Sequence, residues 1–498
     1  MFYKKWLPYD IIHVKNDDIN HNGGIVMLRI NRSKRLLSIL CLTALSLSAL
    51  PATVFAEGDA VLPDTGDTTW LLVSTVLVMF MFMPGLALFY GGLVSQRNIL
   101  STIMHSLSAF LIVTVVWVLW GYSLAFGPNE AGGLIGGLAY AGFRGVGLEV
   151  KDGLTIPHLL FALYQGMFAA ITTALISGGV AERIRFSVWI VFSALWVTLV
   201  YAPMAHWVWN GGWLSKLGGL DFAGGTVVHI LSGVSALTAA VVIGKRRTYP
   251  HQTQPPHNLI FFLIGGMSLW FGWFGFNAGS ALASGGLASL AVGTTQVAAC
   301  AGGLMWLLVE TIRGKKPTMV GGVTGVIAGL IAITPAAGFV TIPSALVIGG
   351  LASVFCYWGL HVLKARLQYD DSLDVFGLHG IGGMWGAIAT GIFATTGVNS
   401  AGANGLLYGN PMQVVTQTID VAVAVLFAAC GTYVILKVIG LFTPLRVTDE
   451  QELTGLDVSL HGEVAYHTVE TMGNQTVAAH HAPSSAGGMS AQPGIKSV

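Results

Sequence analysis

Two acid–histidine pairs with the same spacing stand out as residues that could handle protons. Asp221 lies eight residues before His229 in DFAGGTVVHI, and Asp371 lies eight residues before His379 in DSLDVFGLHG. The segments 226–244 and 375–395, which carry the histidines, contain no Asp, Glu, Lys or Arg. At about 1.5 Å rise per helical residue, an aspartate at a membrane surface would place its histidine about 12 Å deeper, close to mid-bilayer. Ionisable groups at that depth mark pathways, although an imidazole can also simply hydrogen-bond between helices.

The composition sets the class of protein around these residues. Of 498 residues, 54% are hydrophobic and 9% are charged, whereas a soluble domain carries about 25% charged residues. The chain is therefore predicted to be an integral membrane protein. Its net charge of +1 and the absence of a basic stripe give no indication of a nucleic-acid partner. The four cysteines have no paired spacing typical of zinc or disulfide frameworks, and no metal or cofactor is predicted.

The N-terminal region has the pattern of an export signal. Residues 1–26 are polar and mixed, and residues 27–56 follow with a basic start, an apolar core at 36–50 and the small-residue site Val54-Phe55-Ala56. We predict a signal peptide cut after Ala56, and we interpret residues 1–26 as a non-native or upstream extension. The alternative is an uncleaved twelfth helix, but its apolar core is short of the roughly 20 residues that span a bilayer.

Eleven apolar runs follow and predict eleven transmembrane helices in a domain covering residues 57–440. Their lengths near 20 residues and frequent glycines fit tilted, closely packed spans. The runs are approximately 69–94, 98–126, 156–180, 186–206, 225–244, 258–281, 287–309, 319–339, 343–363, 375–395 and 413–436. Among the Asp, Glu, Lys and Arg residues, only Asp420 falls inside a run, the last one.

The orientation follows from lysine and arginine in the connecting segments, because cytoplasmic loops carry the excess. One alternating set of loops holds only Arg144, Lys151 and Lys216. The opposite set, predicted to be cytoplasmic, holds Arg97, Arg183, Arg185, Lys245, Arg246, Arg247, Arg313, Lys315, Lys316, Lys364 and Arg366. The mature N-terminus is then outside the cell membrane, and the tail 441–498 is cytoplasmic.

The eleven runs divide into two five-helix units plus one extra helix. Because five is odd, the second unit enters the membrane from the opposite side, as in transporters with inverted repeats. Asp221 then starts the fifth run at the outer face, and Asp371 starts the tenth at the inner face. The two histidines are expected to approach each other near the midplane, at the interface between the repeats.

Seven motifs, in order along residues 65–466, resemble the ammonium transporters of the Amt/Mep/Rh family, especially bacterial ammonium channels. The motifs are QGMFAAIT at 165–172, AERIRFS at 181–187, DFAGGTVVHI at 221–230, PHNL at 256–259, GWFGFNAGS at 272–280, DVFGLHG at 374–380 and GLDVSLHGEVAY at 455–466. The resemblance implies a homotrimer in the lipid membrane, a central pore in each subunit, and ammonium or methylammonium as the transported solute. It implies no enzyme activity.

The resemblance also assigns roles to individual residues. His229 and His379 match the family's paired pore histidines, and Phe168 and Phe276 match its stacked phenylalanine gate. Trp209, Ser280 and Phe168 match the outer recruitment site, and Asp221 matches the acid that orders this vestibule. Tyr164 stands where the bacterial relatives often have phenylalanine, which affects the expected affinity rather than the chemistry.

The residue types suit these roles, and each also has a simpler interpretation. A tryptophan face can hold a small cation and a serine oxygen can accept its hydrogen bond, but Trp209 could equally be an interfacial anchor. The phenylalanines could be ordinary packing residues, and Asp221 could be a helix cap. An apolar pore penalises a bare cation, so ammonium should lose a proton before the midplane, and the imidazoles could hold ammonia and relay that proton. Transport of ammonia alone and of ammonia with a relayed proton both remain open; the second is preferred.

Two other functions are open on the sequence alone. An ammonium sensor would read pore occupancy through its cytoplasmic tail, but the tail ends in a segment with the composition of disorder. A membrane metalloenzyme would need three or four clustered ligands, and no HExxH motif is present. In bacterial members of the resembled family, the tail and inner loops meet trimeric nitrogen-regulatory proteins of the PII class, which makes such a protein an expected partner.

Overall fold

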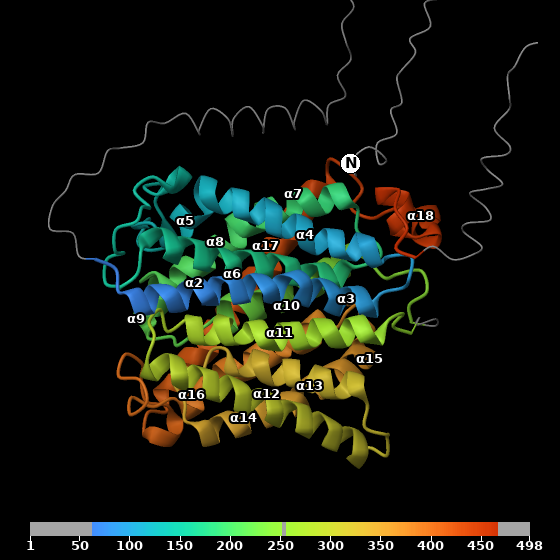
Figure 1. Cartoon of the computed structure of the whole chain (residues 1–498). Helices are drawn as coiled ribbons and strands as arrows, with labels where there is room; N and C mark the ends of the chain where they lie inside the picture. The colour runs from blue at the N-terminus through green and yellow to red at the C-terminus, as the bar shows by residue number, and fades with distance from the viewer. Residues whose placement is uncertain (1–61, 251–254, 467–498) are drawn as a thin grey trace, which may run out of the picture. The chain divides into compact units, whose positions relative to one another are not determined.

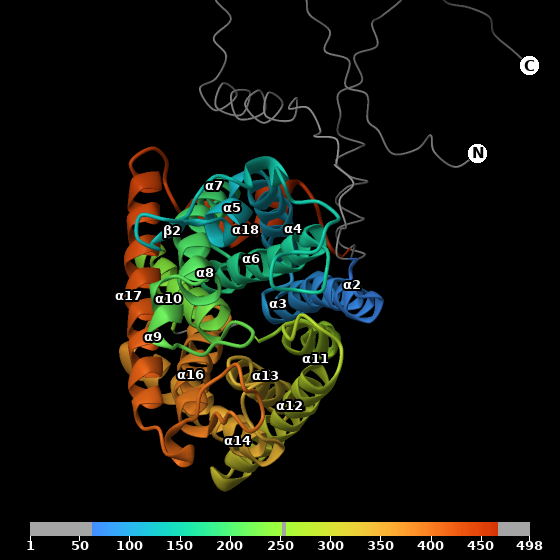
Figure 2. The ribbon, with the colours of Figure 1, turned by 90° about the vertical axis from the view of Figure 1, so that its left-hand side faces the viewer.

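The computed structural model describes residues 62–250 and 255–466. The predicted extension at 1–26 and signal peptide at 27–56 lie outside these ranges. The described chain is a bundle of helices whose axes run largely along one direction (Figure 1). The view rotated by 90° shows that α17 lies along one side of the bundle, beside α10 and α16 (Figure 2).

The elements are α-helices with short π-helical or 3₁₀ turns, labelled η, inserted between them. The first half comprises α2 (Thr65–Phe80), η1 (Met81–Leu86), α3 (Ala87–Leu93), α4 (Ile99–Val116), η2 (Trp117–Gly121), α5 (Tyr122–Phe126), β1 (Asn129–Glu130), β2 (Ile135–Gly136), η3 (Ala141–Phe143), α6 (His158–Val180), α7 (Phe186–Trp196), η4 (Val197–Tyr201), α8 (Ala202–Trp209), α9 (Trp213–Leu217), η5 (Gly225–Ile230) and α10 (Leu231–Ile243). The second half comprises α11 (Leu259–Gly279), α12 (Gly286–Ile312), α13 (Met319–Ile333), α14 (Ile342–Trp358), η6 (Gly359–Leu363), α15 (Lys364–Leu367), η7 (Phe376–Gly380), α16 (Ile381–Phe393), η8 (Leu406–Tyr408), α17 (Met412–Gly440), α18 (Asp449–Thr454) and η9 (Asp457–His461). The strands β1 and β2 pair antiparallel.

Each of the eleven apolar runs is helical over most of its length. Within the described ranges, nine helices are long and apolar enough to cross a membrane. The other two runs, 319–339 and 375–395, form the shorter α13 and η7–α16. The helix α13 stops at Ile333, six residues before its run ends, because Pro335 has no backbone N–H with which to continue the helical hydrogen bonds. Eleven crossings therefore stay a prediction, while the helical architecture is observed.

A network of buried and partly buried charges joins the loops at the end of the bundle that holds α15 and α18, here called the α18 end (Figure 1). The Arg246 guanidinium binds Glu182 at 2.6 Å and Asp370 at 2.8 Å. Burial alone would raise the pKa of each acid, but the guanidinium holds the pKa of Asp370 and of Glu182 below their ordinary values. Both acids are therefore charged at neutral pH, and the network fixes three separate loops to one another.

Replacing Arg246 by methionine should lower the free energy of unfolding by about 3–5 kcal/mol, because two acids would stay buried without their cation. The matched control is Arg247→Met, since Arg247 pairs with Asp449 through side chains that are 42% and 72% exposed; such exposed pairs contribute about 0–1 kcal/mol. Because both acids titrate below their ordinary values near pH 4, the Arg246 contribution should be complete at neutral pH and disappear as the pH falls below about 4. Apparent melting temperatures in detergent compare the variants, and equal losses would contradict this role.

The segment after α17 returns to the α18 end and caps α4. The Asp457 carboxylate accepts the backbone N–H groups of Leu100 at 3.1 Å and Ser101 at 2.7 Å. Arg97 donates to the Leu453 carbonyl, and Asn98 accepts from the backbone N–H of Leu456. An acid at a helix N-terminus satisfies otherwise unpaired N–H groups and is favoured by the helix dipole. The tail is therefore attached to the bundle through the start of α4.

Candidate functional site: a histidine pair beneath stacked aromatic rings

The structure brings His229 and His379 together in the interior of the bundle. Their Nδ1 atoms lie 3.1 Å apart, and the residues are 1% and 6% exposed. A hydrogen bond between two ring nitrogens needs a hydrogen on one and a lone pair on the other. Two neutral imidazoles therefore hold opposite tautomers, so one Nε2 is an acceptor and the other a donor. Among the described residues, Nε2 of His229 has no hydrogen-bond partner.

Each histidine sits in a π-helical turn that an aspartate begins. Asp221 accepts four backbone N–H groups at the start of η5, from residues 224 to 227, at 2.7–3.2 Å. The left-handed conformation of Gly224, with φ of 115°, lets the chain fold back over this carboxylate. Residues 222–224 are therefore not helical, which corrects the expectation of eight continuous helical steps from acid to histidine.

The second aspartate makes a weaker cap at the opposite end of the bundle. Asp371 accepts the Phe376 N–H at 2.7 Å, and Lys364 donates to its backbone carbonyl. Burial raises the pKa of the Asp371 carboxyl to about 6, against the opposing influence of Lys364. The segments η5–α10 and η7–α16 thus enter the bundle from opposite ends, as the sequence predicts.

Two glycines let the histidine-bearing helices touch. Gly233 and Gly383 each follow one of the histidines by four residues. A Cβ at Gly233 would collide with the backbone of His379 and Gly380, and a Cβ at Gly383 would lie 3.0 Å from Cβ of His229. The absence of side chains at these two positions therefore permits the approach of the imidazoles.

Gly233→Ala should destabilise the fold by about 1–3 kcal/mol and push the two helices apart, because the added methyl overpacks a backbone contact. The matched control is Gly350→Ala on α14, where a Cβ would meet its nearest atom only at 3.7 Å. Apparent melting temperatures of the two purified variants test the prediction. If Gly233→Ala melts at the same temperature as Gly350→Ala, the helix contact is not as tight as described.

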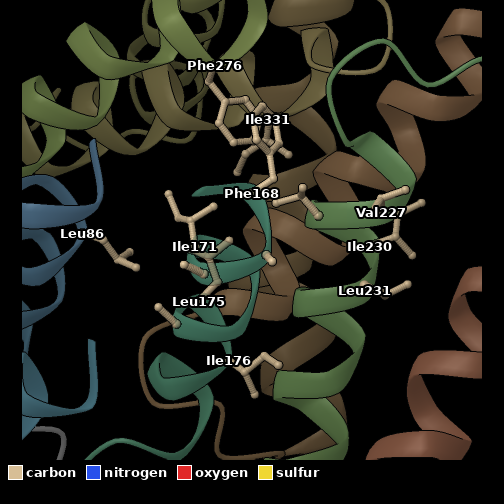
Figure 3. Packing of buried hydrophobic residues seen from close by; sticks show 14 of the residues in the cluster. Leu86, Phe168, Ile171, Leu175, Ile176, Val227, Ile230, Leu231, Phe276 and Ile331 are labelled. Carbon is tan, nitrogen blue, oxygen red and sulfur yellow. The ribbon is translucent and has the colours of Figure 1, made fainter. Parts of the chain in front are cut away.

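Aromatic rings cover the histidine pair on the side of Asp221. Phe168 and Phe276 stack with centroids 4.2 Å apart, and Figure 3 shows the two rings pointing toward each other. Both residues are buried, and the Phe276 ring lies 6.1 Å from the His229 ring between centroids. Trp273, which was not predicted as a site residue, stacks on His229 at 5.5 Å. Its position three residues before Phe276 in GWFGFNAGS was the available signal.

The residues expected to recruit a cation gather beyond the phenylalanine stack. Trp209 lies edge-on to Phe168 at 6.0 Å between centroids, and its indole N–H donates to the Asp221 carbonyl at 2.9 Å. Ser280 donates to the Phe276 carbonyl at 2.9 Å, which leaves the serine oxygen free to accept a hydrogen bond. The arrangement offers a cation an indole, a phenyl ring and a hydroxyl oxygen.

Tyr164 contributes more than the ring face expected from the sequence. Its hydroxyl lies 2.9 Å and 3.0 Å from the carbonyl oxygens of Gly275 and Phe276, and 3.3 Å from the Ser280 hydroxyl. The Phe276 carbonyl belongs to the last turn of α11, where helical partners run out. Because the partners are backbone atoms of a distant helix, no sequence pattern indicates this role.

A small apolar cavity lies beside the histidine pair. Its volume is about 10 Å³ for the centre of a water-sized sphere, about the least that holds one small molecule. Its lining consists of Met81, Leu86, Phe89, Ile171, Leu175, Val228, His229, Leu269, Trp273, Phe276, Ile327 and His379. Phe89 also lines a cavity of about 670 Å³ that reaches Glu182, Arg246 and Lys364. The two cavities therefore meet the same phenylalanine, and the larger one has both apolar and charged residues in its lining.

The described residues contain no cluster of side chains that could bind a metal ion. No three His, Cys, Asp or Glu side chains converge there in a way that could hold a metal ion, and a zinc site needs three or four ligands. Apart from the pair itself, the residues that line the small cavity beside it are apolar.

Comparison with known proteins gives a consistent result across sequence and structure. The model of the Ammonium Transporter Family matches residues 69–466. The ammonium transporter of Bacillus subtilis (strain 168) is 55% identical over 402 residues, covering 80% of this chain and 98% of that protein. The ammonium transporter of Aquifex aeolicus is 47% identical, covering 83% and 96%.

Solved structures show the same similarity. The crystal structure of Saccharomyces cerevisiae Mep2 superposes with a TM-score of 0.72 at 39% identity, covering 78% of this chain and 88% of that one. A structure titled Sensor Amt Protein superposes with a TM-score of 0.73 at 29% identity, covering 80% and 98%. The similarity therefore extends over nearly the full length of the relatives.

Proposed function

Because the chain belongs to the ammonium transporter family, we propose that it carries ammonium across the cell membrane through the histidine site. The observation that carries the proposal is the buried His229–His379 pair, which lines a small apolar cavity beneath two stacked phenylalanine rings. In this proposal the protein acts as a transporter and not as an enzyme. Methylammonium, which differs by one methyl group, is expected to use the same route.

Recruitment takes place outside the phenylalanine stack. The ring faces of Trp209 and Phe168 bind a cation with a cation–π energy of about 2 kcal/mol when the site is desolvated. The Ser280 oxygen accepts a hydrogen bond from one N–H group of the ammonium ion. Asp221 orders this vestibule indirectly, because its carbonyl holds the Trp209 indole and its carboxylate caps the helix of His229. Phe168 and Phe276 form a gate that must open for the solute to pass.

The proton is removed before the midplane because the path beyond is apolar. A bare cation there would lose its hydration without replacement, whereas neutral ammonia fits a cavity of about 10 Å³. The opposite tautomers of the two imidazoles allow a proton to enter at one Nε2 and leave at the other. Ammonia and the relayed proton together move one positive charge. Potassium has no proton to give up and is excluded.

The membrane arrangement in this proposal follows the sequence prediction. Eleven helices in a domain spanning residues 57–440 cross the cell membrane as two inverted five-helix repeats plus α17, with the mature N-terminus outside and the tail 441–498 in the cytoplasm. Three copies form a homotrimer with one pore each. Cleavage of a signal peptide after Ala56 is tested by N-terminal sequencing of purified protein, which would find residues before Glu57 if the peptide is retained.

The attached tail supports regulation by a PII-class protein at the cytoplasmic face. Deleting residues 444–498 should leave the helical bundle folded, because it removes no spanning segment, and should abolish co-purification of the regulator. It also removes the Asp457 cap on α4, so a change in transport activity is expected. The matched control is Asp457→Ala in the full chain, which loses only the cap. Equal recovery of the regulator with truncated and complete protein would contradict the proposed contact.

Sensing is a second candidate function, which the similarity to the structure titled Sensor Amt Protein supports. The two functions differ in whether the solute crosses the membrane. Expression in a cell without ammonium uptake systems tests this, because a transporter restores growth on low ammonium and a sensor does not. Absence of growth, with folded protein present in the membrane, would exclude the transport proposal.

A further inference from the structure

The helix α17 carries a buried polar face that the pore mechanism does not use. Gln413, Gln417 and Asp420 are 5%, 0% and 2% exposed, although they lie in a segment long and apolar enough to cross the membrane. Polar side chains at such depth are costly and usually have a specific task. Among the three, Gln417 has hydrogen-bond partners on two other elements of the bundle.

The Gln417 side chain makes three hydrogen bonds to backbone atoms. Its Oε1 accepts the Leu220 N–H at 2.7 Å, and its Nε2 donates to the Leu220 carbonyl at 2.8 Å and to the Ala387 carbonyl at 3.1 Å. Both ends of the amide are therefore used, and the side chain holds Leu220 as a neighbouring strand would. Few rotamers satisfy all three bonds, so the amide position is fixed.

The two residues that Gln417 holds belong to the two halves of the site. Leu220 immediately precedes Asp221, whose carboxylate begins the turn that contains His229. Ala387 lies on α16, two helical turns after His379. One amide on the last helix thus joins the loop that starts one histidine segment to the helix that continues the other. Figure 2 shows α17 lying beside both α10 and α16.

We infer that Gln417 is a positioning residue that sets the register between the His229 and His379 segments and thereby the contact between their Nδ1 atoms. The expected effect of Gln417 on ammonium current rests on the proposed function. Its effect on the contact between the two imidazoles does not. The 3.1 Å contact between the rings leaves little tolerance, since hydrogen bonds weaken beyond about 3.2 Å. A shift of about 1 Å at a reacting group can cost up to roughly a hundredfold in rate.

A second polar cluster on α17, around Thr432, joins helices without linking the two halves of the site. Thr432 donates to Ser235 on α10 at 2.8 Å and accepts from Trp196 on α7 at 3.1 Å. These bonds join helices, but none reaches the segment of His379 or the loop of Asp221. Gln413 is a closer match, because its side chain donates to the Gly218 carbonyl at 2.9 Å on the same loop and to the Gln417 Oε1 at 3.4 Å, and makes no hydrogen bond to α16. The Gln417 side chain therefore bonds to both halves of the site, whereas the Gln413 side chain makes no hydrogen bond to α16.

The test compares Gln417→Met with Gln413→Met in purified, reconstituted protein. Methionine keeps the length and approximate volume of glutamine and removes its hydrogen bonds. Maximal ammonium-evoked current per folded protein should fall about tenfold or more in Gln417→Met and stay within about twofold of wild type in Gln413→Met. The imidazole nitrogen resonances of His229 and His379, measured by ¹⁵N NMR, should shift in Gln417→Met and stay in place in Gln413→Met.

The NMR comparison distinguishes a residue that positions the histidines from one that only stabilises the fold. A residue that only stabilises the fold leaves the imidazole resonances of the folded protein unchanged. If Gln417→Met gives no folded protein, Gln417→Glu replaces it, since glutamate keeps the acceptor for Leu220 and loses both donated bonds. Wild-type current and wild-type imidazole signals in the Gln417 variant would overturn the inference, as would equal changes in both variants. If the wild-type protein carries no ammonium current, the proposed function fails, while the NMR comparison still decides on positioning.

Discussion

His229→Ala and His379→Ala should each lower the maximal ammonium-dependent current by roughly tenfold or more, or allow potassium to carry current. Each substitution removes one partner of the Nδ1–Nδ1 contact and leaves an apolar void where a proton acceptor stood. The remaining imidazole then has no neighbour to exchange a proton with. Currents from protein reconstituted in lipid vesicles, recorded with ammonium and with potassium, measure both effects.

The control for this prediction is another buried histidine. His105 on α4 is 1% exposed and contacts Phe186 and Trp189 rather than the pair. A large-to-small change in a packed interior costs about 2–5 kcal/mol by itself, so His105→Ala reports the effect of a cavity alone. It should retain wild-type selectivity and current per folded protein. If the two pore variants fold and behave as His105→Ala does, the imidazoles serve only as interhelical hydrogen bonds.

Asp221→Ala should reduce the maximal current by up to roughly a hundredfold and lower the free energy of unfolding by about 3–5 kcal/mol. The substitution leaves four backbone N–H groups at the start of η5 without their acceptor, and each unsatisfied buried group costs about 1–3 kcal/mol. The turn that positions His229 would then rearrange. Current and melting temperature of the same preparations measure the two consequences.

Two further substitutions test whether the effect of Asp221→Ala comes from the loss of the helix cap. Asp152→Ala changes an exposed aspartate in the loop before α6 and should have no effect on either quantity. Asp221→Asn keeps one oxygen acceptor and should lie between alanine and wild type. An Asp221→Ala protein with the current of Asp152→Ala would show that the cap does not position the histidine.

Much of the site could be predicted because its residues repeat a pattern along the chain. The equal spacing of Asp221–His229 and Asp371–His379, in segments without other charges, singled out the histidines. The helical runs could also be predicted, because apolar stretches of about 20 residues in a chain with 9% charged residues are typical of membrane-spanning helices. The odd number of runs in each five-helix unit then predicted that the histidines meet from opposite directions.

The remaining features depend on contacts between distant segments, which local patterns do not encode. Gln417 acts through Leu220 and Ala387, and the Tyr164 hydroxyl acts through the end of α11. The expected histidine depth of about 12 Å assumed a continuous helix from each acid, whereas the chain first loops to form a cap at Asp221. A helix length is likewise misjudged when a proline such as Pro335 ends the helix inside an apolar run.

The central claim is that the histidine path carries ammonium nitrogen with a proton and excludes metal cations. Transient currents from wild-type protein in lipid vesicles on a solid-supported membrane test it most directly, using equal concentration jumps of ammonium chloride and potassium chloride with protein-free vesicles as the blank. We expect a saturable inward current with ammonium and none with potassium above the blank. Equal currents with both cations, or no ammonium current from folded protein, would contradict the claim.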